Sequence, residues 1–152
     1  MSSSLSKIVD GGPLFRFALL TRRWRQIVDQ ELRTSGLTDA TWRPLFYLNI
    51  LGDGTRQKDL AEALGVKGPS LVRLLETLQD KGLIESSADA LDRRAKRLSL
   101  SSAGKICARR VQQRVQALEE QLLAVLNEEQ MTQLPAMIQA LESGLENWTE
   151  QA

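Results

Sequence analysis

Apolar side chains recur at every third or fourth position through most of this chain, which is the period of amphipathic α-helices. The first such run predicts a helix over residues 13–34 that opens at Pro13. A second helix follows, and two threonines could cap it. A cap at Thr41 leaves Pro44 in the first turn, whereas a cap at Thr38 places the proline deeper, where a kink is expected.

The stretch over residues 57–82 has the spacing of a helix-turn-helix. Ala61 stands where two helices must touch, and Gly65 stands where the turn needs a positive φ. Five apolar side chains are spaced to enter a shared core: Leu60, Leu64, Val66, Leu71 and Leu74. The polar positions that remain on the second helix are free to face a DNA groove. The alternative is an ordinary pair of packed helices.

Two short runs, residues 83–87 and 96–100, predict strands, and a polar turn joins them. They predict a β-hairpin attached to the helix-turn-helix, an arrangement called a wing. Arg93 and Arg94 lie near its tip, where they could reach phosphates or a narrow minor groove. The alternative is a solvated hairpin without a partner.

The C-terminal third predicts two further helices. Ser101 or Ser102 caps the first, and Asn127 opens the second, with Gln130 placed to complete a capping box. Apolar positions of the last helix alternate in steps of three and four, which indicates a helix-packing seam: Met131, Leu134, Ile138, Leu141, Leu145 and Trp148. The small winged lobe does not need this surface, so a homodimer is expected. The alternative is a monomer whose terminal helices fold back.

A chain of 152 residues with 42% hydrophobic and 26% charged residues is typical of a soluble globular protein. We expect residues 1–152 to form one unit, with a winged helix-turn-helix lobe over 55–100 and a helical dimerisation region over 13–34 and 101–150. No run approaches the roughly 18 apolar residues of a membrane span, and the start lacks the apolar run of a signal peptide. A cytoplasmic protein without membrane association is therefore expected.

The net charge of +1 hides an asymmetry along the chain. Residues 56–114 carry thirteen basic and seven acidic groups, whereas residues 115–152 carry seven acidic groups and no basic ones. Basic charge is thus concentrated on the helix-turn-helix segment, where it could neutralise phosphates.

The sequence contains no histidine, which removes the commonest general base and the commonest metal ligand. Adjacent carboxylates such as Glu119 and Glu120 point in different directions on a helix and do not converge on a substrate. We therefore expect no enzyme activity, no metal site and no cofactor. The single cysteine, Cys107, excludes an intrachain disulfide and agrees with a reducing compartment.

From about Leu14 to Trp148 the chain resembles the MarR family of winged-helix regulators, and more narrowly its SlyA branch. Three runs carry the resemblance: Pro69–Arg73, Gln79–Ile84 and Asp92–Leu100. It implies a mainly α fold with a small β-hairpin wing and an intertwined helical dimer. It also implies repression, or antagonism of another DNA-bound protein, relieved by a small molecule.

The resemblance places Pro69, Ser70 and Arg73 on the face that enters the major groove. Arg73 could pair with guanine O6 and N7, Ser70 could donate to a base edge or a phosphate, and Pro69 could meet a thymine methyl. Lys67, just before this helix, is expected to contact a phosphate.

In the wing, the resemblance suggests that Asp92 orients either Arg93 or Arg94 through a salt bridge while the other arginine probes the minor groove. The sequence does not say which arginine does which. Two such lobes related by a two-fold axis should bind a palindromic site in double-stranded DNA, with half-sites about ten base pairs apart.

Members of the SlyA branch often respond to aromatic carboxylates or phenols. By resemblance, Trp42 and Phe46 are candidate walls of such a site, and Arg22 is a candidate carboxylate partner. The two aromatic residues could instead belong to the core, and Arg22 could be an exposed or interface cation. Redox control through Cys107 is disfavoured because related sensors carry their cysteine near the first helix. The alternative functions are a winged-helix protein-interaction module and a nonspecific DNA-coating protein without effector control.

Overall fold

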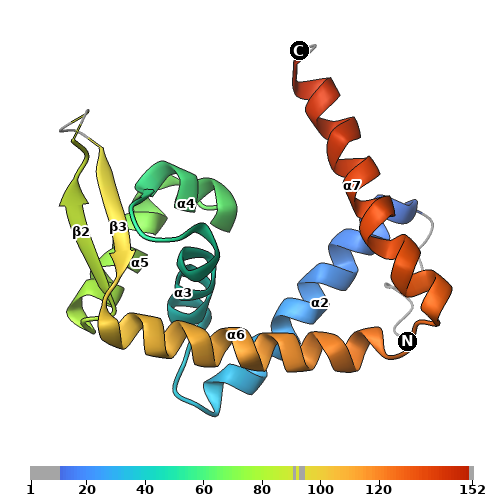
Figure 1. Cartoon of the computed structure of the whole chain (residues 1–152), viewed down its shortest axis with the longest axis horizontal. Coiled ribbons are helices and arrows are strands. Elements are labelled where there is room, and N and C mark those ends of the chain that lie inside the picture. The colour runs from blue at the N-terminus through green and yellow to red at the C-terminus, as the bar shows by residue number, and fades with distance from the viewer. Residues whose placement is uncertain (1–10, 91, 93–94, 151–152) are drawn as a thin grey trace. The chain divides into compact units, whose positions relative to one another are not determined.

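The computed structural model describes residues 11–90, 92 and 95–150, with side chains through Trp148. Six helices and three short strands occupy this part of the chain (Figure 1). In chain order they are α2 (Pro13–Arg33), α3 (Asp39–Leu51), β1 (Thr55–Arg56), α4 (Gln57–Leu64), α5 (Gly68–Asp80), β2 (Ile84–Ala88), β3 (Lys96–Leu100), α6 (Ser102–Leu123) and α7 (Glu128–Glu150). The predicted fold class, mainly α with a small β-hairpin, is confirmed.

The chain divides into two compact units, one ending at Val115 and the other beginning at Gln116. Helix α6 runs through the boundary. The first unit holds the helix-turn-helix, the strands and α2. The second unit holds the end of α6 and all of α7.

Helix α3 uses Thr38 rather than Thr41 as its N-cap. The Thr38 carbonyl accepts the backbone N–H groups of Thr41 and Trp42 at 2.8 and 2.9 Å. Pro44 therefore lies inside the helix, where it is buried and has no N–H for the carbonyl of Ala40. The helix accepts this loss because its neighbouring residues are held in the core.

The turn of the helix-turn-helix depends on Gly65, as predicted. Its φ of 65° and ψ of 32° are left-handed, a conformation that costs a residue with a Cβ about 1 kcal/mol or more. The backbone N–H of Val66 closes the turn on the carbonyl of Ala61 at 3.0 Å. The chain then reverses directly into α5.

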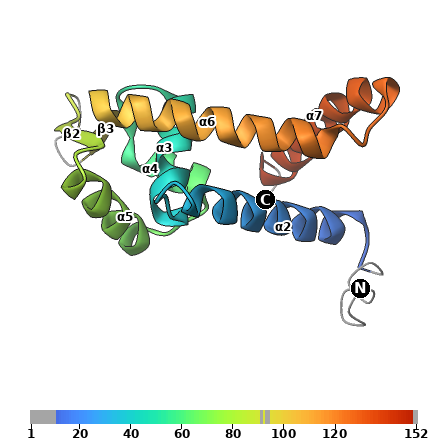
Figure 2. The ribbon, with the colours of Figure 1, turned by 90° about the horizontal axis from the view of Figure 1, so that it is seen from below.

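The strands form one antiparallel sheet in the order β1-β3-β2. The β2–β3 pairing runs from Ile84 opposite Leu100 to Ala88 opposite Lys96. Both views show this hairpin beside α5 (Figure 2). Strand β1 was not predicted, because a two-residue segment is too short to show a period. It pairs Thr55 with Leu98.

The core of the first unit joins α3, α4, α5, the sheet and the start of α6. Leu74, predicted to enter it, is only half-buried, whereas Leu75 and Leu78 are buried. The buried cluster consists of Leu45, Leu48, Leu60, Leu64, Leu71, Leu75, Leu78, Ile84, Leu98, Leu100 and Ala108. This packing fixes α5 against the base of the hairpin.

The start of α6 is attached to the same place. Ser101 is its cap, accepting the backbone N–H of Gly104 at 3.0 Å and donating to the carbonyl of Gly82 at 2.6 Å. A Cβ at position 104 would lie 1.9 Å from the carbonyl oxygen of Leu83, so only glycine permits this approach. Helix α6 therefore begins in close contact with the connection between α5 and β2.

In the second unit, the predicted capping box opens α7. The backbone N–H of Gln130 donates to Asn127 Oδ1 at 2.9 Å, and the backbone N–H of Asn127 donates to Gln130 Oε1 at 3.0 Å. Across the described residues, no helix is long and apolar enough to cross a membrane. The same residues contain no cluster of histidine, cysteine or carboxylate side chains that could hold a metal ion.

Candidate nucleic-acid interface

Helix α5 presents a polar face opposite its buried leucines. Ser70 and Arg73 are exposed and three residues apart, so both lie on the side of the helix that faces away from the core. Pro69 is exposed in the first turn, and Lys67 is the exposed N-cap residue. The structure thus places Pro69, Ser70 and Arg73 on the exposed side of α5 and Lys67 at the N-terminus of that helix.

Two further exposed residues on α5 were not singled out from the sequence. Val72 and Glu76 are one helical turn apart and flank the face that carries Arg73. An exposed valine offers a methyl surface to a thymine methyl group, and an exposed glutamate can accept from cytosine N4. Their spacing from Leu71 and Leu75, which are buried, is the sequence signal that could have identified them as exposed.

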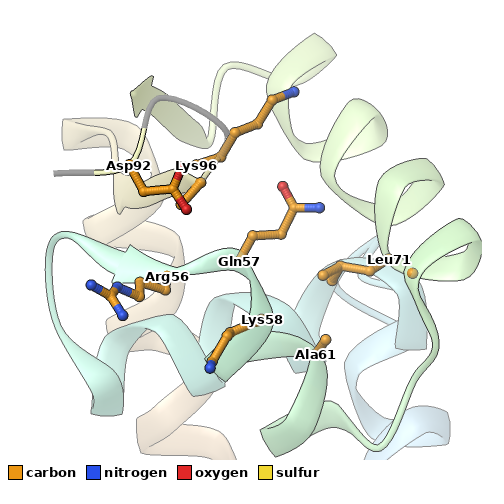
Figure 3. Close-up of a pocket in the computed structure, with 9 residues that line it drawn as sticks. Arg56, Gln57, Lys58, Ala61, Leu71, Asp92 and Lys96 are labelled. Carbon is orange, nitrogen blue, oxygen red and sulfur yellow. The ribbon is translucent and has the colours of Figure 1, made fainter. Parts of the chain in front are cut away.

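A groove of about 640 Å³ lies between α4, the first turn of α5 and the wing (Figure 3). Three of its lining side chains are cations and one is an acid: Arg56, Lys58, Lys96 and Asp92. Its remaining lining is mainly small or apolar: Gln57, Ala61, Gly68, Leu71 and Ala95. In Figure 3 Gln57 extends toward the middle of the groove, with Lys96 and Asp92 on the wing side. Three cations and one acid give this concave surface an excess of positive charge.

The groove adds basic residues to the sequence-predicted interface. Lys58 lies on α4 and Lys96 begins β3, so the cations come from both the helix-turn-helix and the wing. Each lies in a segment that the sequence had marked as basic. Only the packing of α4 against β3 brings them to one groove.

Asp89, the residue after β2, pairs with two arginines that the sequence had not connected with it. Oδ2 of Asp89 lies 2.8 Å from Nε of Arg97 and 3.4 Å from Nε of Arg56. Asp92 is exposed and lines the groove. Arg93 and Arg94 lie outside the described residues, so their expected roles stay predictions. The contacts of Asp89 could not be predicted, because a single aspartate in a polar turn does not indicate which arginines it will pair with.

The proposed effector residues divide into a packed pair and an exposed cation. Trp42 is buried and meets the ring of Phe46 edge to face, with centroids 6.3 Å apart. Trp42 Nε1 donates to Oδ1 of Asp29 on α2 at 2.6 Å. Arg22 is exposed on α2. Trp42 therefore packs as a core residue does, while Phe46 is half-buried.

Cys107 is half-buried against the core of the first unit. Burial raises the pKa of its thiol above the usual value of 9.0, while the charges of Arg110 and Lys81 oppose the rise less strongly. The thiol is therefore protonated at neutral pH, which makes it a poor nucleophile. This agrees with the expected packing role.

Helices α2 and α7 each expose apolar side chains within the single chain. On α7, the predicted seam is half-buried at Leu134 and exposed at its other five positions: Met131, Ile138, Leu141, Leu145 and Trp148. On α2, the exposed apolar residues are Leu14, Phe15, Phe17, Leu20 and Ile27. Exposed apolar surface of this extent marks an interaction surface.

The helix-turn-helix and its β-hairpin define a winged-helix protein. The family model of the MarR family matches residues 35–95. The transcriptional regulator PA3341 is 30% identical over 86% of this chain and 96% of its own, with a TM-score of 0.77. The chain belongs to the MarR family. Its place in the SlyA branch stays a prediction.

Two crystal structures of MepR from S. aureus give similar matches. MepR in complex with DNA is 29% identical over 88% of this chain and 98% of its own, with a TM-score of 0.73. MepR in its DNA-binding conformation is 30% identical over 86% of this chain and 96% of its own, with a TM-score of 0.74. The likeness therefore extends well beyond the winged lobe to most of both chains.

Proposed function

We propose that this protein is a sequence-specific DNA-binding transcription regulator. The observation that carries the proposal is the exposed polar face of α5 beside a groove lined by Arg56, Lys58 and Lys96. A recognition helix needs such a face for base edges, and the flanking cations neutralise the phosphates on either side. The DNA complex of the related MepR supports the same reading.

Arg73 is the residue proposed to read a base, through a bidentate contact with guanine. Ser70 and Pro69 complete the major-groove face, and Lys67 contacts a phosphate at the start of the helix. In the wing, Asp92 would orient either Arg93 or Arg94 through a salt bridge while the other arginine contacts the minor groove.

We propose that the active form is a homodimer. The exposed apolar stripes on α2 and α7 are the surfaces that a second copy would cover, and burying them contributes about 25 cal/mol per Å². A two-fold dimer presents two α5 helices, so its operator is palindromic, with half-sites about ten base pairs apart.

A small aromatic carboxylate or phenol is the proposed effector, and its binding releases the repressor or antirepressor from DNA. Trp42 and Phe46 would form the apolar walls, and Arg22 would pair with the carboxylate. The aromatic pair lies where α3 meets α2, because Trp42 is hydrogen-bonded to Asp29. A ligand there would act on the junction between a proposed dimerisation helix and α3, which packs against the helix-turn-helix. The related MepR regulates a multidrug efflux pump, MepA.

The test is selection of bound sequences from a random duplex pool at physiological salt, followed by titration of the enriched DNA. An enriched palindrome, bound less tightly by orders of magnitude as salt rises from low to physiological concentrations, is the expected result. Titration with a panel of aromatic acids then identifies the effector class from loss of binding. Absence of any enriched sequence would contradict the proposal and favour an interaction module or nonspecific DNA coating.

A further inference from the structure

A buried carboxylate lies where strand β2 ends and the turn of the wing begins. Asp89 directly follows β2, and its side chain is 1% exposed. Its Oδ2 atom contacts Nε of Arg97 at 2.8 Å and Nε of Arg56 at 3.4 Å. These arginines are directly opposite each other on β3 and β1. One carboxylate therefore connects all three strands of the sheet.

Arg97 extends this connection to the turn before β1. While its Nε atom bonds Asp89, its Nη1 atom donates to the carbonyl of Gly54 at 2.8 Å. The planar guanidinium holds both bonds in a fixed geometry, which a lysine could not reproduce. The backbone N–H of Gly54 in turn donates to the carbonyl of Leu98 at 3.0 Å. The hairpin is thus anchored to the segment that leads into α4.

Asp89 also orders the chain toward the tip of the wing. Its backbone N–H donates to the carbonyl of Ala95 at 2.9 Å, and its Oδ1 atom accepts the backbone N–H of Asp92 at 3.4 Å. The two predicted minor-groove residues, Arg93 and Arg94, lie between these positions in the sequence. Asp89 therefore holds both ends of the segment that carries them.

We propose that Asp89 is a positioning residue for DNA binding. Its carboxylate fixes the wing against the helix-turn-helix, so that the wing and α5 engage one DNA duplex in register. The inference rests on the proposed function, because positioning matters only if both elements bind DNA. The role differs from that expected of Asp92, which was to orient an arginine at the tip.

If Asp89 did not position the wing, loss of its carboxylate would strengthen DNA binding, for two reasons. Removing a negative charge from a DNA-binding lobe strengthens attraction to phosphates. Release of Arg56 and Arg97 from their shared partner would also free two cations for the DNA. Of these three effects, only the loss of positioning predicts weaker DNA binding after the charge is removed.

The experiment compares Asp89→Asn with Glu85→Gln. Glu85 is an exposed acid on β2, four residues before Asp89, so the control removes the same charge from the same arm of the hairpin without touching the network. Affinity for the enriched DNA is measured below the unfolding temperature of every variant. We expect Asp89→Asn to weaken binding roughly tenfold and Glu85→Gln to leave it unchanged or tighter. Protection of the minor groove at the site flanks should be lost, while guanine N7 protection in the major groove persists.

Hydrogen exchange without DNA supplies a second readout. In Asp89→Asn, the backbone amides of residues 89, 92 and 95 should exchange faster than in the natural protein. Exchange of the α5 amides should not change. If Asp89→Asn does not fold, Arg97→Lys is the second variant. It keeps the positive charge but cannot make both guanidinium bonds, to Asp89 and to Gly54, and should give the same weaker DNA binding and faster exchange. Unchanged or tighter DNA binding by the Asp89 variant would overturn the proposal, as would unchanged exchange in the wing. If the unmodified protein selects no sequence, the proposed function fails, and exchange still decides whether Asp89 holds the wing.

Discussion

The indole Nε1–H of Trp42 donates a 2.6 Å hydrogen bond to Oδ1 of Asp29. A buried tryptophan needs a partner for its N–H, and here the partner comes from a different helix. The bond joins α2, which belongs to the predicted dimerisation region, to α3, which packs against both helices of the helix-turn-helix. Its acceptor also lies close to a second carboxylate, that of Asp39, and this pair has a consequence for stability.

Asp39→Asn should become increasingly stabilising relative to the natural residue as pH rises. Burial raises the pKa of Asp39 above 3.8; the charge of Arg43 opposes this, and the charge of Asp29 adds to it. A raised pKa means that the folded state holds the proton more tightly than the unfolded state, so stability falls as pH rises through the shifted pKa. Urea unfolding from pH 3.5 to 7 would measure the difference.

Asp53→Asn is the matched control, and its effect on stability should change with pH in the opposite direction. A hydrogen bond from Lys105 at 2.6 Å lowers the pKa of the Asp53 carboxyl. The contribution of Asp53 to stability is fully present above its pKa in the unfolded chain. It is lost as pH falls through the lower pKa that this carboxyl has in the folded protein. A parallel pH trend in the two variants would show that a general charge effect, and not these local environments, is responsible.

Arg73→Ala should weaken binding to the selected DNA by about 1 to 3 kcal/mol and relax the preference at one base position. Lys67→Ala should weaken all sequences alike and reduce the dependence on salt, since it removes a phosphate contact. Repeating the selection with each variant separates the two effects. If neither substitution changes affinity, α5 is not the recognition helix.

Gly65→Ala should destabilise the protein by about 1 kcal/mol or more, because its left-handed backbone penalises a Cβ. Gly68→Ala is the control at the start of the next helix. The added Cβ there meets no atom within 4 Å, and the backbone is not left-handed, so stability should change by less than about 0.5 kcal/mol. Midpoints of urea unfolding give both values. Equal losses in the two variants would refute the assigned role of the turn.

Ile138→Glu should convert the proposed dimer to monomer. Ile138 is an exposed apolar residue of the α7 seam, and a charge there would be left desolvated in an interface. Gln139→Glu introduces the same charge at the adjacent exposed position, which is outside the seam, and should leave assembly intact. Sedimentation velocity over a concentration series distinguishes the two. A dimer of undiminished stability in Ile138→Glu would place the interface elsewhere.

The sequence by itself determined the local elements. The helix over residues 13–34, the left-handed turn at Gly65 and the Asn127–Gln130 capping box appear essentially as predicted. Each depends on residues within about one helical turn, where backbone sterics and short hydrogen-bonded rings dominate. The same local pattern placed Ser70 and Arg73 on the exposed face of α5.

Only the tertiary structure decided which distant side chains share an environment. It selected Thr38 over Thr41 as the cap of α3, added β1 to the hairpin, and gathered Lys58 and Lys96 at one groove. It also brought Arg56 to Asp89, residues separated by more than thirty positions in the chain. Periodicity reports which face of an element is buried, but not which other element covers that face. Packing of helix against sheet fixes those contacts, and the position of the wing depends on them.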